Sequence, residues 1–228
     1  MTVILLSLTW AVIRVWQPSR VEIPIKHTNT TIEVIFGDLF AQDGYRAIAV
    51  SEFFDSELGL PVAEKSLHGF FVKKCFGGHP ESFDTIVAAE LQSVQPQRVE
   101  KNCGKKLKYP IGTTALVPVN NDRYLCFALC ETNPDTCKVH ADVPTLWRAL
   151  QGLWEKARVV LGGSTLVVPL VGSGTSGVGL PPRELLDLII LSAIAETKQR
   201  HITNRIRVVL TEDHFDEVDL KETKRYWS

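Results

Sequence analysis

Hydrophobic and polar positions along the chain follow two periods, one typical of β-strands and one typical of α-helices. Short apolar or β-branched runs bounded by turn residues predict strands. The predicted strands are Val21–Ile25, Thr31–Phe36, Arg46–Val50, Thr113–Val119, Arg123–Cys130, Thr165–Leu170 and Arg205–Thr211. Apolar residues spaced three and four apart predict helices at Ser66–Phe76, Ser82–Ser93, Ala141–Val160 and Pro182–Arg200. Strands that alternate with long helices imply a layered α/β sheet.

Local signals refine this outline. The first two strands predict a hairpin-like pair, and Asn120–Asp122 is a turn sequence that joins two later strands. Trp147, Leu150 and Trp154 have the spacing of one buried helix face. The segment Gln95–Tyr109, which contains Pro, Gly and several lysines, predicts a loop. No internal repeat and no second domain boundary is evident, so one large domain is the simpler interpretation.

The first residues, Met1–Trp16, form an apolar run interrupted only by Ser, Thr and Arg14. The run is shorter than the roughly 20 residues that cross a hydrocarbon core, so it predicts part of a spanning helix or an interfacial anchor. A signal peptide is disfavoured, because no basic region precedes the run and no small-residue cleavage site follows it. Tryptophan and arginine near its end suit a membrane boundary with the basic side in the cytoplasm. A buried N-terminal helix of the globular domain remains the alternative.

Composition excludes several function classes. The chain is 45% hydrophobic and 22% charged with a formal net charge of −1, which is typical of a folded domain and lacks the footprint of most nucleic-acid binders. The one basic run is interpreted as a solvated loop; it consists of Lys101, Lys105, Lys106 and Lys108. Five cysteines without a C-x-x-C pair predict free thiols in a reducing interior rather than a disulfide framework. No His, Cys or carboxylate spacing predicts a metal site, and no cofactor is expected.

The strongest chemical signal is a glycine-rich loop between a buried strand and a helix. Gly172, Gly174, Gly177 and Gly179 fall within eight residues, and a helix opened by Pro181-Pro182 follows. Glycines let backbone N–H groups approach an anion, and a helix N-terminus adds partial positive charge, so the loop predicts a phosphate cradle. Three hydroxyls add possible donors, those of Ser173, Thr175 and Ser176. The alternative is a mobile surface loop.

The same glycines match G-x-G-x-x-G, the dinucleotide fingerprint, but the context does not fit. That fingerprint belongs to the first βα unit of a doubly wound sheet, with an acidic residue closing the next strand. Here the loop lies near the C-terminus, and Glu196, at the appropriate distance, falls inside a predicted helix.

Several segments taken together resemble macro domains. Glu33–Leu39 resembles the strand-Gly-Asp start of that family, and Val168–Gly179 resembles its second phosphate loop. The segments that resemble more closely the divergent macro domains of Thoeris antiphage effectors are Ile48–Glu57, Ser66–Phe71 and Tyr109–Val117. The resemblance covers roughly residues 21–211. It implies a macro-like three-layer α/β/α fold with a mixed central sheet, preceded in some such systems by a membrane-spanning segment.

The resemblance implies an ADP-ribose-binding site built from three stretches. The first is Gly37, Asp38 and Leu39, where Asp38 would accept the adenine amino group. The second lines the ribose and diphosphate side, and comprises Ser51, Glu52, Phe53, Phe54 and Asp55 together with Ser66, Leu67, His68 and Gly69. The third is Gly172–Gly177, which would cradle the diphosphate. From the residues alone, Asp38 is equally a helix N-cap, His68 is more often a hydrogen-bonded structural histidine, and Phe53 and Phe54 fit the core.

One departure from the family pattern bears on function. Hydrolytic macro domains place an asparagine-rich stretch after the second strand, whereas this chain has Ala-Val-Ser-Glu-Phe-Phe at residues 49–54. No catalytic residue is therefore assigned. A hydrolase using Glu52 or Asp55 as general base remains an alternative, as does an adaptor with a vestigial pocket.

The predicted organisation is a membrane-proximal segment at residues 1–20 and a macro-like domain at residues 21–228. The resemblance implies a sensor whose ligand, ADP-ribose or a conjugate of it, is made by a TIR-domain enzyme and triggers a membrane response. The expected location is membrane-associated, with the macro-like domain in the cytoplasm and a homo-oligomer possible.

Overall fold

The computed structural model describes residues 18–174 and 177–228, so the part of the predicted membrane segment in residues 1–17 lies outside the described chain. Within the described ranges, no helix combines the length and the apolar character that a membrane crossing requires. The first strand begins at Arg20, one residue before the predicted start of the domain.

A mixed β-sheet forms the centre of the domain. The strands are β1 (Arg20–Pro24), β2 (Thr31–Phe36), β3 (Tyr45–Ser51), β4 (Gln97–Arg98), β5 (Leu107–Lys108), β6 (Thr114–Val119), β7 (Asp122–Thr132), β8 (Val139–His140), β9 (Leu166–Pro169) and β10 (Arg205–Leu210). The main sheet has the order β1-β2-β10-β9-β3-β7-β6, with β8 paired to β7, while β4 and β5 form a separate two-stranded ladder. The run from β2 to β7 is parallel; β1 and β6 are antiparallel to their neighbours.

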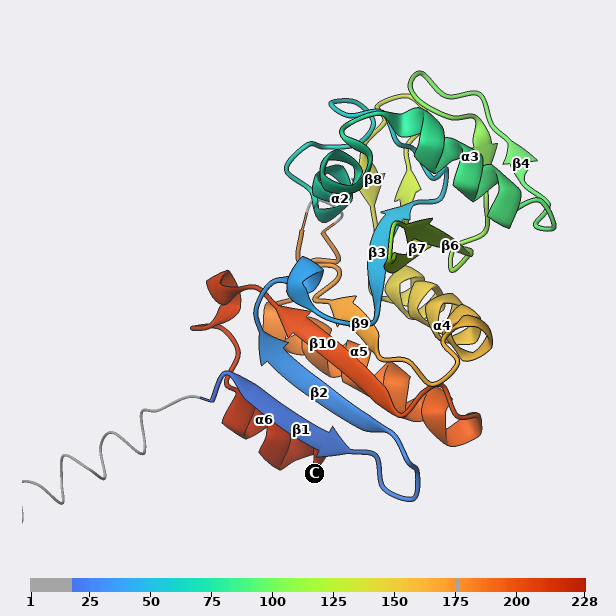
Figure 1. Cartoon of the computed structure of the whole chain (residues 1–228). Helices are drawn as coiled ribbons and strands as arrows, with labels where there is room; N and C mark the ends of the chain where they lie inside the picture. Colours follow the sequence, from blue (N-terminus) through green and yellow to red (C-terminus); the bar gives the residue numbers. More distant parts are fainter. Residues whose placement is uncertain (1–17, 175–176) are drawn as a thin grey trace, which may run out of the picture.

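Helices cover the two faces of this sheet, as the α/β pattern predicts. They are η1 (Leu39–Ala41), α2 (Leu67–Phe76), α3 (Pro80–Glu90), α4 (Val143–Val160), α5 (Pro182–Gln199), η2 (Glu212–His214) and α6 (Leu220–Trp227). One hydrophobic cluster joins α4, α5 and α6 to the sheet, and the other joins α2 and α3 to its opposite face. Figure 1 shows α5 and α6 behind the strands β10, β2 and β1. The three-layer macro-like arrangement is confirmed.

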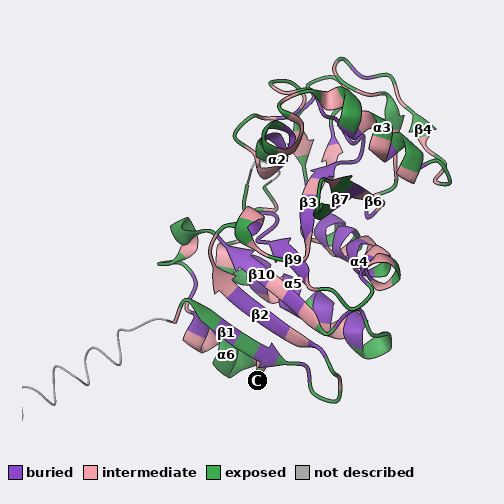
Figure 2. Ribbon diagram, in the orientation of Figure 1, coloured by how far each residue is buried: buried purple, intermediate pink, exposed green. Residues whose placement is uncertain are grey.

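Burial follows these layers (Figure 2). In α4 the buried stripe includes Leu146, Leu150, Leu153 and Trp154, whereas Trp147 is only half-buried. The prediction that Trp147 belongs to the buried face is therefore wrong: the preceding residue, Leu146, occupies that face instead. The predicted helix at Ser82–Ser93 begins earlier, at Pro80, and ends earlier, at Glu90.

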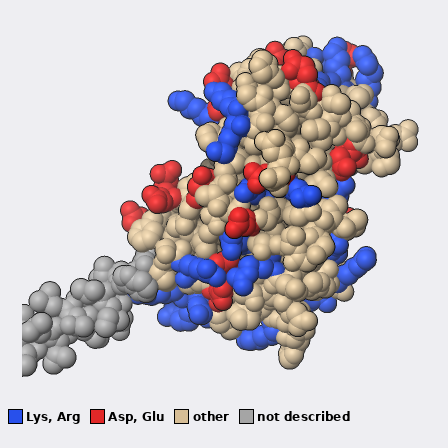
Figure 3. Space-filling view, in the orientation of Figure 1, with Lys and Arg blue, Asp and Glu red and all other residues tan. Residues whose placement is uncertain are grey.

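An ion-pair network occupies the face of β1, β2 and β10 that no described helix covers. Glu33 is 1% exposed and lies within 2.7 Å of both Arg20 and Arg207, with Arg205 at 3.4 Å. Figure 3 shows this face as a group of basic and acidic side chains. The arginine side chains shield Glu33 from water, so on this face charged side chains, rather than a helix, cover the sheet.

Two expectations for the cysteines and lysines are wrong. Cys103 and Cys137 form a disulfide across 34 residues of sequence. Spacing alone gives no sign of this pair, since neither residue belongs to a short motif. The segment Gln95–Tyr109 is not simply a solvated loop, because it contains the β4–β5 ladder and because Lys101 is buried with no exposed side-chain surface.

Candidate ligand-binding site

A cavity of about 1030 Å³ lies at the carboxyl ends of the parallel strands. Its walls come from the ends of these strands and from the segments that follow them. The lining residues fall in the ranges 37–39, 49–51, 59–63, 65–68, 129–130, 137–139, 169–174, 209 and 211–214. Open α/β sheets bind ligands at this edge, because loops from several strands converge there.

The glycine-rich loop forms one wall of the cavity. Gly172, Ser173 and Gly174 line it directly after β9, while Gly177 lies outside the lining and residues 175–176 lie outside the described chain. Gly172 has a φ of +93°, and a Cβ there would approach Val178 within 2.8 Å, so glycine is required for the backbone itself. Gly174 is exposed, and a Cβ built on it meets no atom within 4 Å. The loop thus has a fixed root and an open tip.

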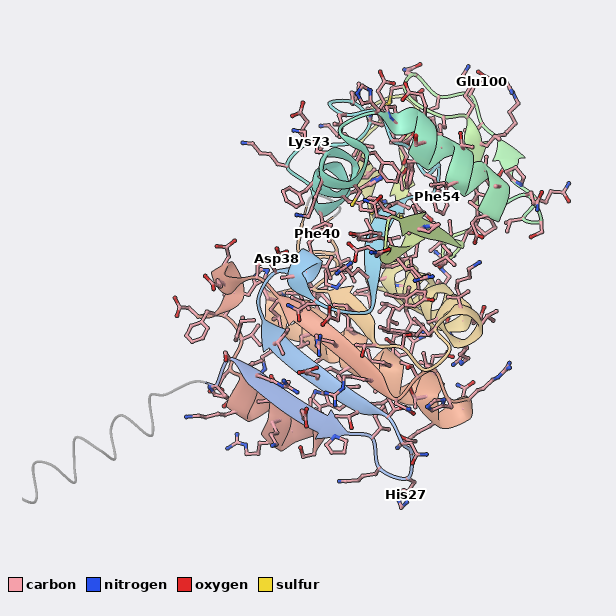
Figure 4. The ribbon with its side chains drawn as sticks, in the orientation of Figure 1. His27, Asp38, Phe40, Phe54, Lys73 and Glu100 are labelled. Carbon is pink, nitrogen blue, oxygen red and sulfur yellow. A yellow bond between two sulfur atoms is a disulfide. The ribbon has the colours of Figure 1, made fainter. Side chains whose placement is uncertain are left out.

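Asp38 lines the cavity immediately after β2, which is separated from β9 by β10 in the sheet. Its side chain accepts a hydrogen bond of 2.9 Å from the backbone N–H of Phe40 and caps η1, so the N-cap interpretation is confirmed. The side chain is nevertheless exposed and lines the cavity. Figure 4 places Asp38 and Phe40 at the end of β2 that faces α2. One carboxylate can serve as cap and ligand acceptor together.

The first turn of α2 supplies a third wall. The Ser66 hydroxyl caps the helix by accepting a hydrogen bond from the N–H of Gly69 and donates to the carbonyl of Ala63. Ser66, Leu67 and His68 line the cavity, whereas Gly69 is buried outside the lining. A Cβ at Gly69 would approach the Ala63 carbonyl oxygen within 2.3 Å, so Gly69 permits close packing of the preceding loop rather than ligand contact.

His68 has an environment that keeps its imidazole neutral. Burial, together with the positive charge of Lys105, lowers the pKa of His68 to about 3. Its Nε2 is buried without a hydrogen-bond partner among the described residues. A neutral imidazole at the cavity wall can exchange one hydrogen bond with a ligand without adding charge.

The stretch after β3 is divided between cavity and core. Ser51 lines the cavity, but Glu52, Phe53, Phe54 and Asp55 do not. The two phenylalanines are at most 1% exposed, which confirms the core interpretation. The structure therefore gives no support to the predicted contact of these four residues with a ligand, because none of them lines the cavity.

Lysines of the basic run neutralise the two carboxylates. Asp55 is 1% exposed; it accepts hydrogen bonds from the Lys101 ammonium at 2.6 Å and from the backbone N–H of Lys105 at 2.8 Å. Glu52 is equally buried and pairs with Lys108 at 2.9 Å. The prediction of a solvated run is wrong for Lys101 and Lys108, because each compensates a buried carboxylate that would otherwise be costly, whereas Lys106 is exposed and pairs with the exposed Glu100.

The packing around Asp55 leaves no room beside the carboxylate. Gly104 has a φ of +68°, and a Cβ there would lie 2.2 Å from Oδ1 of Asp55. The Ser51 hydroxyl donates a hydrogen bond of 3.1 Å to the other carboxylate oxygen. Asp55 therefore ties the end of β3 to the segment 101–105 behind the cavity.

Three segments that line the cavity were not predicted from the sequence. They are the loop at 59–63, the segment Cys137–Val139, and residues 211–214, which include η2. Residues 211–214 could have been predicted, because they follow β10 and ligands bind at the carboxyl ends of parallel strands. The segment Cys137–Val139 reaches the cavity through the short pairing of β8 with β7, which no motif marks.

The described residues contain no group of three or more His, Cys, Asp or Glu side chains arranged to hold a metal ion. The cavity instead offers an open glycine loop, the exposed carboxylate of Asp38 and a neutral histidine. This combination suits an elongated ligand with a phosphate near its middle and a hydrogen-bond donor at one end.

Comparisons with solved structures show the fold. A single-residue variant of the Oceanobacillus iheyensis macrodomain matches with a TM-score of 0.59 and 14% identity, covering 92% of this chain and 97% of that chain. The same macrodomain with ADP matches with a TM-score of 0.54, 13% identity and coverages of 91% and 95%. A glycine-to-valine variant with ADPR gives a TM-score of 0.55, 12% identity and coverages of 91% and 98%.

The comparison with curated proteins gives no match. The sequence model described as "Thoeris protein ThsA, Macro domain" matches residues 32–211, which span the chain from β2 to the end of β10. The matched region contains the glycine-rich loop, Asp38 and the first turn of α2. The chain therefore belongs to the macro-domain family of the Thoeris protein ThsA.

Proposed function

We propose that the cavity binds ADP-ribose or a conjugate of it, and that the protein is a sensor in a Thoeris antiphage system. The family to which the chain belongs supports the antiphage context. Structures of the Oceanobacillus iheyensis macrodomain, which shares the fold, are named for bound ADP and ADPR. In this proposal a partner TIR-domain enzyme makes the signal from NAD.

The observation that carries the proposal is that the glycine loop and Asp38, which follow β9 and β2, line one cavity at the carboxyl edge of the sheet. The volume of about 1030 Å³ is at the upper end of the range typical of small-molecule sites, roughly 300–1,000 Å³. Backbone N–H groups near Gly174 would face the diphosphate, and the exposed Asp38 carboxylate would accept from the adenine amino group. Ser66 and His68 would line the ribose side.

Binding without turnover is the form of the proposal that the site favours. The two carboxylates considered as general bases, Glu52 and Asp55, are 1% exposed and paired with lysines outside the cavity. A general base must reach the proton that it abstracts, directly or through one water. The hydrolase alternative therefore lacks a positioned base, and we assign no catalytic residue.

The output of the sensor is proposed to be a membrane response. The apolar run Met1–Trp16 would attach the chain to a membrane with the macro domain in the cytoplasm, as a homo-oligomer that assembles or opens when ligand binds. Ligand can shift such an equilibrium only by its differential affinity for the two states. Ligand binding would favour one arrangement of the loops that line the cavity.

Titration calorimetry of the detergent-solubilised full chain tests the proposal. ADP-ribose and amino-acid conjugates of ADP-ribose are the ligands, and AMP, which lacks the second phosphate and the distal ribose, is the control. We expect heat with at least one ADP-ribose compound and much weaker binding of AMP. No heat with any of them refutes the proposed ligand class, and release of free ADP-ribose from an ADP-ribosylated protein would establish the hydrolase instead.

A further inference from the structure

A second hollow, which shares no lining residue with the ligand cavity, gathers basic side chains at one corner of the domain. It has a volume of about 670 Å³ and lies between the start of β1 and helix α6. Four of its eight lining residues are Arg or Lys and one is acidic. The lining consists of Pro18, Arg20, Val21, Glu22, Lys221, Lys224, Arg225 and Ser228. We call this surface the basic hollow.

Helix α6 holds its part of the basic hollow in a fixed position. Asp219 caps the helix by accepting hydrogen bonds from the backbone N–H groups of Lys221 and Glu222. At the other end, the indole N–H of Trp227 donates to Asp187 of α5 at 2.7 Å. Figure 1 shows α6 behind β1, next to the point where the described chain begins. The basic side chains are therefore presented by a docked helix rather than by a loose tail.

The cations of the hollow are unequally compensated. Arg20 is held by Glu22 at 2.7 Å and by Glu33 at 2.5 Å, so its charge is largely neutralised within the protein. Arg225 is 82% exposed and makes only a long contact of 3.7 Å with Glu222. No carboxylate of the described residues pairs with Lys224. The outer side of α6 thus carries positive charge that is available to an external anion.

An exposed aromatic ring lies among these charges. Tyr226 is 73% exposed and contacts the edge of Trp227 with ring centroids 5.1 Å apart. Tyrosine is amphipathic, and together with lysine and arginine it is enriched where proteins meet the boundary between headgroups and water. The combination distinguishes this surface from a purely electrostatic patch for a soluble anion.

The chain itself indicates which anionic surface the basic hollow would meet. Pro18 lines the hollow and follows Trp16, the last residue of the apolar run, by two residues. Two extended residues span at most about 7 Å. This span is shorter than the Debye length of about 8 Å at physiological salt. If the apolar run enters a membrane, the basic hollow is held within electrostatic reach of its headgroups.

From this arrangement we infer that the basic hollow and the outer side of α6 dock on anionic phospholipid headgroups. The inference rests on the membrane attachment put forward in the proposed function, and adds a contact that orients the domain. Each Lys or Arg near an anionic membrane surface is worth about 1 kcal/mol, or about fivefold in partitioning. Loss of two such residues should therefore reduce the contribution of anionic lipid by about 25-fold.

The test is partitioning of the purified full chain to vesicles of phosphatidylcholine alone or of phosphatidylcholine with phosphatidylserine, at low and high salt. We expect phosphatidylserine to strengthen binding at low salt, and expect Lys224→Gln/Arg225→Gln to lose most of that gain. The matched control is Lys198→Gln/Arg200→Gln, two exposed cations at the C-terminal end of α5. Since α5 contacts α6 at Asp187, Lys198 lies eleven residues, or about 16 Å, further along the helix. The control should behave as the parent.

The outcomes separate this inference from the proposed function. Equal binding of the parent to both kinds of vesicle, or equal losses in the two double variants, overturns the lipid contact and leaves membrane attachment intact. No vesicle binding by the parent overturns both. If Lys224→Gln/Arg225→Gln keeps its phosphatidylserine dependence but loses binding to an oligonucleotide, the hollow is a nucleic-acid surface and the inference is wrong. Calorimetry with ADP-ribose should give parental affinity for both double variants.

Discussion

The substitution Gly174→Asp places a negative charge at the open tip of the glycine loop. The structure predicts a small cost to folding, because Gly174 is exposed, its φ lies outside the left-handed region, and an added Cβ meets no atom within 4 Å. Surface substitutions of this kind usually change stability by less than about 0.5 kcal/mol. Any large effect on binding must therefore come from the ligand.

The expected loss of affinity follows from the charge. A carboxylate about 4 Å from a phosphate, at an effective dielectric of about 20 near a protein surface, is repelled by about 4 kcal/mol. Displaced N–H groups add to this, since a charge-assisted hydrogen bond contributes about 1.5–3 kcal/mol. Because about 1.4 kcal/mol corresponds to a factor of ten, Gly174→Asp should weaken binding at least about 1,000-fold.

Calorimetry with the best ADP-ribose compound measures the effect, and circular dichroism checks the fold. Gly162→Asp is the control for added charge, since Gly162 lies before β9, at the opposite end of that strand; its φ of +55° adds a folding cost, but the folded variant should keep parental affinity. Gly174→Asn separates bulk from charge and should lose less. A folded Gly174→Asp protein that binds within threefold of the parent would refute the phosphate cradle.

Three further predictions concern Asp38, His68 and the disulfide. Asp38→Ala should weaken binding about tenfold and lower the free energy of unfolding by about 1 kcal/mol, whereas Asp38→Asn should retain the cap; urea unfolding and calorimetry distinguish the two losses. His68 is neutral in the folded protein down to about pH 3 but takes up a proton on unfolding below about pH 6.5, so stability should fall with decreasing pH in that window. The parent should lose about 1 kcal/mol more than His68→Gln between pH 6 and pH 5 in urea unfolding, and equal losses would show that His68 does not titrate as described. Replacing both Cys103 and Cys137 by serine should cost about 3–4 kcal/mol for a closed loop of this length, and only the parent should respond to dithiothreitol.

Sequence patterns predicted the fold well where a single period governs a whole element. Strands β9 and β10 are buried along most of their length and α5 has eight buried residues among its eighteen, so hydrophobic runs mark these elements clearly. Pairing across the hairpin of β6 and β7 followed from its Asn-Asn-Asp turn. Helix α6 was missed because its eight residues are mostly polar and only Leu220 and Thr223 are buried.

The site was predictable to the extent that it depends on backbone turns. Gly172 and Asp38 lie at strand ends where the chain must turn, and both line the cavity. Glu52 and Asp55 looked like ligand contacts or bases because sequence shows their chemistry but not their partners. Lysines from a segment some fifty residues later compensate both carboxylates, and that pairing depends on tertiary contacts that no local pattern contains.

The cavity wall is assembled from loops that follow five different strands, and this has a practical consequence for finding the ligand. A compound that binds across these loops holds together segments from residue 37 to residue 214, so occupancy should resist unfolding of the whole domain. At a concentration of 100 times Kd, mass action raises the free energy of unfolding by about 2.7 kcal/mol. For a domain of this size, each kcal/mol raises Tm by about 2–4 °C. Nucleotide compounds can therefore be ranked by melting temperature, without an activity assay or a partner enzyme.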